Sequence, residues 1–194
     1  MNRSLRIAVA DDESDMREYY QTILPRLGHE VVGAARNGRE MLTVCYETKP
    51  DLVILDIKMP EVDGIEVAVE LYRTMPVPVI LVSAYHDAEL ISRAEADHIL
   101  AYLVKPIKQA DLQPAIGLAY RRFEQFEEMR RETQTLKQAL EDRKIIERAK
   151  GILMKRSGLS EEDAFRRMQK LASQKNQKLI EVARSLVTAD EALG

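Results

Sequence analysis

The chain has 194 residues, of which 45% are hydrophobic and 31% charged, and its formal net charge is −3. This length gives room for one full domain plus a smaller module. No run of about 18 apolar residues indicates a membrane span, and no signal peptide is visible. Because Cys45 is the only cysteine, no disulfide can form within the chain, and we expect a reducing, cytoplasmic location.

The charge is divided unevenly along the chain. Residues 1–117 contain 12 Lys and Arg against 19 Asp and Glu, a net charge of −7. Residues 118–194 contain 17 against 13, a net charge of +4. An acidic first part and a basic second part predict different partners for the two parts.

Short apolar segments alternate with segments of helical periodicity through the first part of the chain. The predicted strands are Leu5–Ala10, Val31–Ala35, Leu52–Asp56, Val77–Val82 and Ile99–Val104. The predicted helices follow them: one capped by Ser14, then Glu40–Thr48, Ile65–Thr74, about Asp87–Ala96, and one that begins near Gln109. This alternation predicts an α/β domain with a doubly wound, five-stranded parallel sheet.

Polar residues stand at the carboxyl ends of four of these strands: Asp11 and Asp12, Asp56, Ser83 and Lys105. Open α/β sheets bind their ligands at this edge. A buried carboxylate is costly unless a cation meets it, so Asp56 at the end of an apolar strand needs such a partner. We expect these side chains to converge on one site.

The chemistry of this group suits acceptance of a phosphoryl group. Three carboxylates offer the oxygen ligands that Mg²⁺ prefers, and Lys105 supplies a positive charge for Asp56 or its phosphate. Asp56 would be the nucleophile that forms an acyl phosphate. Phosphatases that attack with a strand-end aspartate are the competing class, but they carry a second Asp two residues later. Lys58 occupies that position here, which argues against a turnover enzyme.

The first part resembles the receiver domain of bacterial two-component response regulators, a flavodoxin-like fold. The resemblance covers residues 1–120 and is carried by Asp11-Asp12, Asp56 with Met59-Pro60 and Asp63-Gly64, Ser83-Ala84, and Lys105-Pro106. It implies a sensor histidine kinase as partner and Asp56 as phosphoacceptor.

The resemblance also implies roles for the neighbouring residues. Mg²⁺ would be bound by Asp11, Asp12, Asp56 and the backbone carbonyl of Lys58. The phosphate-binding and switch residues would be Ser83, Ala84, Tyr102 and Lys105. The peptide bond between Lys105 and Pro106 would be cis.

A long helix is predicted to continue outward from the first domain. Residues 121–145 of this helix form the predicted linker. Residues near heptad a and d spacing, which begin just before the linker, are Ala119, Phe126, Met129, Thr133, Leu136 and Leu140. This pattern favours a dimeric coiled coil. A single solvated amphipathic helix is the alternative, since Arg122 and Arg143 fall near d positions.

The end of the chain predicts a small three-helix module, residues 133–194, that overlaps the linker helix. Its first helix carries an apolar stripe at helical spacing, Ile145 or Ile146, Ala149, and Ile152 or Leu153, and stops at Gly158. Ser160 caps the second helix, Asn176 marks a turn, and the third helix carries its apolar residues between Leu179 and Val187.

This module resembles the ANTAR domain, an RNA-binding antitermination domain found after receivers. The matching residues are Ile146–Met154, Gly158–Glu161, Ala164-Phe165, Asn176 and Leu179–Ala183. The RNA-binding candidates are Arg148, Lys150, Lys155, Arg156, Arg166, Arg167, Lys170 and Asn176. Such a basic group can neutralise phosphates, and the alternative is an ordinary solvated helix face.

Gly151 is unusual because it lies inside a predicted helix, where glycine costs about 1 kcal/mol relative to alanine. Close helix packing or the close approach of an RNA backbone would compensate this cost, and we favour packing.

Together these features predict a cytoplasmic response regulator with no membrane part. Phosphorylated Asp56 would control a dimer of ANTAR modules that binds paired RNA hairpins and causes transcription antitermination. The rival hypothesis is a DNA-binding or protein-interaction regulator that uses the same carboxyl-terminal helices.

Overall fold

The computed structural model describes residues 3–84 and 99–193. The chain forms two compact units, Met1–Glu127 and Glu128–Gly194. The predicted helix at Asp87–Ala96 lies outside the described residues. No helix in the described ranges is long and apolar enough to cross a membrane.

The first unit is built on a parallel sheet with strand order β2-β1-β3-β4-β5. The strands are β1 (Arg6–Ala10), β2 (Glu30–Ala35), β3 (Leu52–Asp56), β4 (Val79–Ser83) and β5 (Ile99–Val104). Both β3 and β4 are buried along their whole length, as expected of central strands in a sheet covered on both faces. The predicted doubly wound five-stranded sheet is confirmed.

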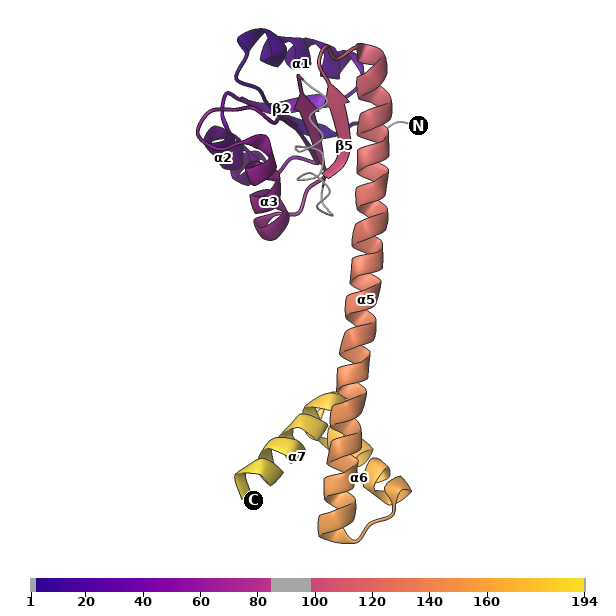
Figure 1. Ribbon diagram of the computed structural model, residues 1–194. Helices are drawn as coiled ribbons and strands as arrows, with labels where there is room; N and C mark the ends of the chain where they lie inside the picture. The colour runs from indigo at the N-terminus through magenta and orange to yellow at the C-terminus, as the bar shows by residue number, and fades with distance from the viewer. Residues whose placement is uncertain (1–2, 85–98, 194) are drawn as a thin grey trace. The chain divides into compact units, whose positions relative to one another are not determined.

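Helices cover both faces of this sheet (Figure 1). One core joins the sheet to α2 (Gly38–Thr48) and α3 (Gly64–Thr74). The other joins it to α1 (Ser14–Arg26) and the start of α5 (Gln109–Ser157). β1 and β3 are inner strands of the sheet with a core on each face, so the carboxylates at their ends follow buried strands.

Several element boundaries differ from the predicted ones by one or two residues. Ser14 is the first residue of α1 and not its cap; Glu13 takes the cap position without a side-chain hydrogen bond. α2 and α3 begin two residues and one residue earlier than predicted, because Asn37 and Asp63 accept hydrogen bonds from the amides of Glu40 and Glu66 and so cap the helices. β4 begins after Pro78, whose missing N–H cannot join a sheet ladder.

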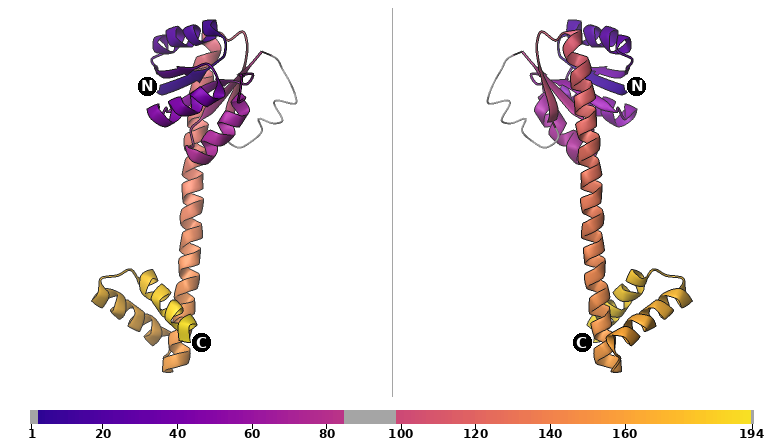
Figure 2. Two further views of the ribbon diagram at one scale, coloured as in Figure 1. Left: turned by 90° about the vertical axis from the view of Figure 1, so that its left-hand side faces the viewer. Right: turned by 90° about the vertical axis from the view of Figure 1, so that its right-hand side faces the viewer.

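The second unit contains the end of α5 with α6 (Glu161–Lys175) and α7 (Leu179–Leu193), which lie beside one another in Figure 2. Its small core consists of Ala149, Leu153, Ala164, Met168 and Ala183 with partly buried apolar neighbours. Gly158 ends α5 at a φ of +65°, and the amide of Asp163 donates to Ser160 Oγ at the predicted cap of α6. The predicted long helix and three-helix module are confirmed.

Candidate phosphoacceptor site

The site lies where β1, β3 and β5 end. The register places Ala10 beside Leu55 and Asp56 beside Val82, so the residues that follow these strands meet at one edge of the sheet. Asp11, Asp12 and Asp56 each offer a carboxylate oxygen within 4.8 Å of the others. Asp11 and Asp56 are buried, whereas Asp12 is exposed. The predicted convergence of the three carboxylates is confirmed.

Lys105 is the cation that meets these carboxylates. Its Nζ lies 3.0 Å from Asp11 Oδ2, 2.9 Å from Glu13 Oε1 and 3.4 Å from Asp56 Oδ2. The side chain is only 14% exposed, and its amide donates to the carbonyl of Ser83 at 2.8 Å. Partial burial disfavours the charged amine, but the bonds to Glu13 and Asp11 and the charge of Asp56 outweigh this, so the pKa of Lys105 is raised.

The single cation leaves the acids incompletely neutralised. Burial raises the pKa of Asp56 to about 6 from its ordinary 3.8, against the attraction of Lys105 and with the repulsion of Asp11. Burial also raises the pKa of Asp11. Asp11 Oδ2 is buried, and its contact with a cation is the ion pair with Lys105 Nζ at 3.0 Å.

These features fit a divalent cation. The carboxylates supply the oxygen ligands that Mg²⁺ prefers. The exposed Asp12 opens the site to solvent, which suits the bound water that Mg²⁺ keeps. Asp11, Asp12 and Asp56 would hold it. No described contact involves the carbonyl of Lys58, so its part in the metal site stays a prediction.

The backbone around Asp56 leaves no room for larger residues. A Cβ built on Gly64 would lie 2.2 Å from the carbonyl oxygen of Asp56. The Gly64 amide donates to the carbonyl of Ile57 at 3.0 Å. The loop after β3 therefore folds back tightly against its own strand end, and this fixes the direction of the Asp56 carboxylate.

The remaining predicted residues take these positions. Ser83 is buried at the end of β4, and Ala84 follows it exposed. Tyr102 is partly buried and packs against the core on the α2 and α3 side. The peptide bond between Lys105 and Pro106 is cis, as predicted. The switch and phosphate-binding roles of these residues stay predictions.

Two residues of the site were not predicted. Glu13 holds Lys105, and its amide donates to Asp11 Oδ1 at 3.0 Å. Arg17 Nη1 donates to the carbonyls of Asp11 and Asp12 at 2.8 and 2.9 Å, which fixes the loop that carries both acids. The sequence offered two signals for them: Glu13 directly follows the pair Asp11-Asp12, and Arg17 lies one turn into the next helix.

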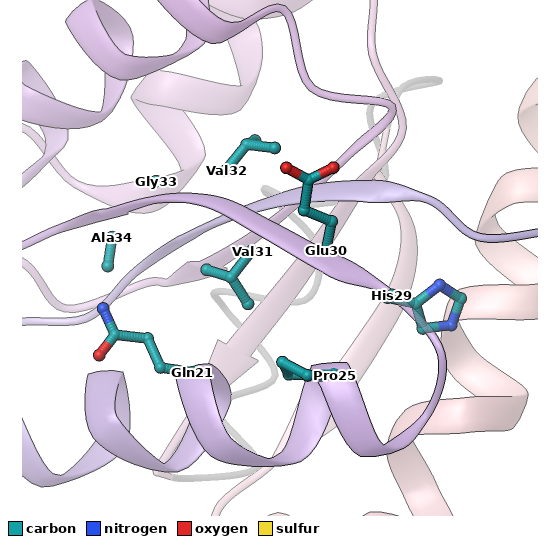
Figure 3. A pocket seen from close by; sticks show the side chains of 8 residues that line it. All are labelled: Gln21, Pro25, His29, Glu30, Val31, Val32, Gly33 and Ala34. Atoms are coloured by element: carbon teal, nitrogen blue, oxygen red, sulfur yellow. The ribbon is translucent and has the colours of Figure 1, made fainter.

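A shallow cavity of about 590 Å³ lies away from these carboxylates, between α1 and the free edge of β2. Figure 3 shows Gln21 and Pro25 of α1 on one side and the strand residues on the other. None of Asp11, Asp12, Asp56 and Lys105 lines it.

The RNA-binding candidates in the second unit differ in their surroundings. Lys150 is buried, at 8% exposure, and its Nζ lies 2.8 Å from Glu147 and 2.7 Å from Glu161. The bonds to Glu147 and Glu161 raise the pKa of Lys150. These contacts tie α5 to the start of α6, which argues for a structural role of Lys150.

The other candidates are exposed. Arg148, Arg156 and Arg166 pair with Glu191, Asp190 and Glu162. Lys155, Arg167 and Lys170 form no ion pair with the described residues. Asn176 ends α6 in the left-handed conformation, with a φ of +51°. A direct RNA contact by any of them stays a prediction.

The packing expected at Gly151 is wrong. The residue is exposed, and no heavy atom of the described residues lies within 4 Å of the position its Cβ would take. The buried side of α5 here is formed by Ala149, Lys150 and Leu153. Gly151 therefore has no packing partner in the described part of its own chain.

Comparison with known proteins gives the same division of the chain. Residues 7–117 match the response regulator receiver domain family, and residues 134–187 match the ANTAR domain family. The transcriptional regulatory protein PdtaR of Mycobacterium tuberculosis is 39% identical over 178 residues, which span 92% of this chain and 87% of PdtaR.

Other similarities cover the first domain alone. The probable transcriptional regulator ycf27 of Galdieria sulphuraria is 35% identical over 129 residues, 65% of this chain and 49% of that protein. The crystal structure of a response regulator receiver domain protein from Clostridium thermocellum has a TM-score of 0.58 at 31% identity, covering 62% of this chain and 98% of that one. The chain therefore belongs to the response regulators, with an amino-terminal receiver domain and an RNA-binding ANTAR domain as its output.

Proposed function

We propose that phosphorylation of Asp56 by a sensor histidine kinase controls a dimer of ANTAR domains that binds RNA hairpins and causes transcription antitermination. The observation that carries the proposal is the arrangement of Asp56, which is buried at a strand end with Lys105 3.4 Å away and Asp11 beside it. We assign residues 1–120 to the receiver, 121–145 to the linker helix and 133–194 to the ANTAR module.

The phosphoryl transfer is a displacement at phosphorus. A carboxylate oxygen of Asp56 attacks the phosphorus of the kinase's phosphohistidine, a P–O bond forms, and the P–N bond breaks as the imidazole leaves and takes up a proton. With a pKa of about 6, Asp56 is largely ionised at neutral pH and available as the nucleophile. Bound Mg²⁺ would supply positive charge between the acids and the phosphoryl oxygens.

Lys105 and the strand ends hold the product. The amine of Lys105 can move from the carboxylate of Asp56 to the negatively charged phosphoryl oxygens. Ser83 offers a hydroxyl at the end of the adjoining strand. Lys58 stands where a phosphatase would carry its second acid. We therefore assign the site to holding a phosphate as a signal, with slow loss of the phosphate and no turnover of a substrate.

The linker supports dimerisation because its apolar seam is exposed and is not covered by any of the described residues. Met129, Leu136 and Leu140 are 65%, 61% and 58% exposed, although large apolar side chains at heptad spacing normally face another helix. In a parallel pair, Glu132 at g would meet Lys137 at e of the second copy. An antiparallel pair would instead bring together Arg130, Lys137 and Lys144, so the charges favour a parallel dimer.

Charge reversal tests this dimer. Glu132→Lys and Lys137→Glu should each weaken association, and the double variant should restore it, as measured by light scattering over a range of protein concentrations. If all three variants associate as the wild type does, the proposed coiled-coil dimer is wrong.

The output is tested by RNA binding. Gel-shift titration of paired RNA hairpins with the full chain, with and without a phosphodonor, should show tighter binding after phosphorylation. Asp56→Asn should show no response to the donor. A preference for duplex DNA over hairpins would favour the rival DNA-binding function, and a folded dimer that binds no RNA in either state would overturn the output.

A further inference from the structure

An exposed glycine stands in the middle of a regular helix of the ANTAR domain. Gly151 is six residues from the end of α5 at Ser157, so it neither caps the helix nor begins a turn. Glycine disfavours helix relative to alanine, and here no atom of the described residues, apart from the nearby backbone of α5 itself, lies within 4 Å of the position a Cβ would take. An alanine would fit among the described residues and would favour the helix, so nothing in the part of the chain that the structure describes requires the glycine.

Gly151 lies at the centre of the outward face of α5. At 3.6 residues per turn, a residue two positions after Ala149 and two before Leu153 points to the opposite side of the helix from both. Ala149 and Leu153 belong to the core shared with α6 and α7. The helix backbone is therefore open to another molecule at Gly151, and on the side away from the core.

Cationic side chains accompany this opening. Three basic residues lie at helical spacing from Gly151: Lys144 seven residues before it, Arg148 three before it and Lys155 four after it. This spacing places them in a row beside the glycine. All three are exposed. The neighbouring acid, Glu147, is held by Lys150 at 2.8 Å. The pairs Lys144–Glu141 and Arg148–Glu191 are exposed on both sides, and such surface pairs are weak.

We propose that the sugar–phosphate backbone of RNA lies along this face and makes its closest approach to α5 at Gly151. The proposal rests on the RNA-binding function proposed above and locates its contact surface. Phosphates flanking the contact would face the row of Lys144, Arg148 and Lys155. A side chain at position 151 would stand between the helix and the RNA.

A second copy of the chain is the other class of occupant, and the charges disfavour it. The apolar seam of the linker ends at Leu140, and the next positions at the same heptad spacing are Arg143, Glu147 and Lys150. Two copies packed antiparallel at Gly151 would also bring their rows of Lys144, Arg148 and Lys155 to the same side of the contact, where they would repel. RNA has the complementary charge along its whole length.

Substitution of Gly151 tests the proposal in the phosphorylated full-length chain. The probe is an RNA with two hairpins, selected from a pool of random loop sequences by the wild-type protein. Gly151→Ala should keep or raise the melting temperature and weaken RNA binding at least about tenfold, the change produced by 1.4 kcal/mol. The larger Gly151→Gln should weaken it further. Gly117→Ala makes the same change in the receiver part of α5, also with open space around the Cβ, and should leave binding unchanged.

Salt dependence supplies a second measurement. Lys155→Gln should reduce the slope of log affinity against log salt by about one, as loss of one phosphate contact does. Lys175→Gln, a change to an exposed lysine of α6, should leave the slope as it is.

The outcomes separate this inference from the proposed function. If the wild-type protein selects no RNA, the proposed function fails. If it selects RNA and Gly151→Ala binds that RNA equally well, the contact surface is wrong while RNA binding stands. A dimer that dissociates in Gly151→Ala would identify a second copy as the occupant and would overturn the inference.

Discussion

The amine of Lys105 is closer to Glu13 than to Asp56, the residue that we assign as phosphoacceptor. Its Nζ lies 2.9 Å from Glu13 Oε1 and 3.4 Å from Asp56 Oδ2. Glu13 lies at the rim, with its side chain 62% exposed, and Asp56 lies in the interior, with its side chain 7% exposed. Lys105 is therefore shared between an outer acid and the reactive one, and the outer acid competes for it.

Removal of the outer acid should speed phosphorylation. Glu13→Gln frees Lys105 for Asp56 and removes a negative charge from the path of an incoming phosphoryl group. An exposed pair of this kind contributes about 0.2–1 kcal/mol, so we expect roughly a two- to fivefold higher rate with a small phosphodonor such as acetyl phosphate. Glu18→Gln, on the exposed side of α1, is the control. A slower rate in Glu13→Gln would show that Glu13 assists the reaction.

Asp56 should make the metal-free protein less stable as the pH rises. Its pKa is about 6 in the folded chain against 3.8 ordinarily, so between these pH values the folded state binds more protons and stability falls with rising pH. The difference corresponds to on the order of 3 kcal/mol. Asp56→Asn removes this cost but also loses the attraction of Lys105, so we expect a gain of about 1–3 kcal/mol at pH 7.5.

Thermal unfolding with a chelator present measures this effect. The advantage of Asp56→Asn should shrink as the pH is lowered from 6 to 4, because the wild-type carboxyl then becomes protonated. Asp15→Asn, an exposed acid nearby, should give no such pH-dependent difference. An Asp56→Asn variant that is less stable than the wild type at pH 7.5 would contradict a net unfavourable Asp56 charge.

Mg²⁺ should stabilise the protein more when Lys105 is absent. Lys105→Met leaves Asp11, Asp56 and Glu13 without their cation, and loss of one partner from a buried pair costs about 3–5 kcal/mol. A divalent cation held by the carboxylates would replace part of the lost charge. The rise in melting temperature on addition of Mg²⁺ should therefore be larger in the variant than in the wild type. An equal rise in melting temperature in both proteins would show that Mg²⁺ binding does not depend on the charge of Lys105.

The sequence was sufficient to predict the sheet and the convergence of its strand-end residues, because both follow from local patterns. Apolar runs of about five residues can be recognised as strands, and parallel strands bring their carboxyl ends together. The sharing of Lys105 with Glu13 could not be predicted in this way. It depends on which of several nearby acids the long lysine side chain reaches, and residue order does not determine that choice.

The surroundings of the basic residues in the ANTAR domain likewise could not be predicted from the sequence. Lys150 and Lys155 both occur in the segment 148–156, which mixes basic and apolar residues, and the pattern alone gives them equal weight. Packing separates them, because α6 begins beside Lys150 and covers it, whereas the face that carries Gly151 and Lys155 is left open.

Gly64 should tolerate no side chain. A Cβ there would lie 2.2 Å from the carbonyl oxygen of Asp56 and 3.2 Å from Cα of Ile57, so Gly64→Ala must displace the loop that holds Asp56. We expect a loss of about 2–4 kcal/mol in the free energy of unfolding, in the upper part of the range for single substitutions. Denaturant titration measures it, with Gly117→Ala as the control in open space. Equal stability of the two variants would mean that the loop adapts freely.

Lys150 should stabilise the ANTAR domain without contacting RNA. Its buried amine joins Glu147 and Glu161 across the junction of α5 and α6, so Lys150→Gln should lower the melting temperature of the carboxyl-terminal unit. The bond from Lys150 also lowers the pKa of Glu161, so the stabilisation is present above the ordinary pKa of 4.5 and is lost as the pH falls through the lowered value. Lys150→Gln should therefore differ from the wild type at neutral pH and match it more closely in acid.

The matched change Lys155→Gln separates stability from binding. Lys155 is exposed and has no ion pair among the described residues, so Lys155→Gln should leave the melting temperature unchanged while it lowers RNA affinity and its salt dependence. Lys150→Gln should have the opposite pattern at temperatures where the domain remains folded: reduced stability and an unchanged salt slope. A reduced slope in Lys150→Gln would mean that the lysine leaves Glu147 and Glu161 to bind a phosphate, and that α6 moves away from α5 when RNA binds.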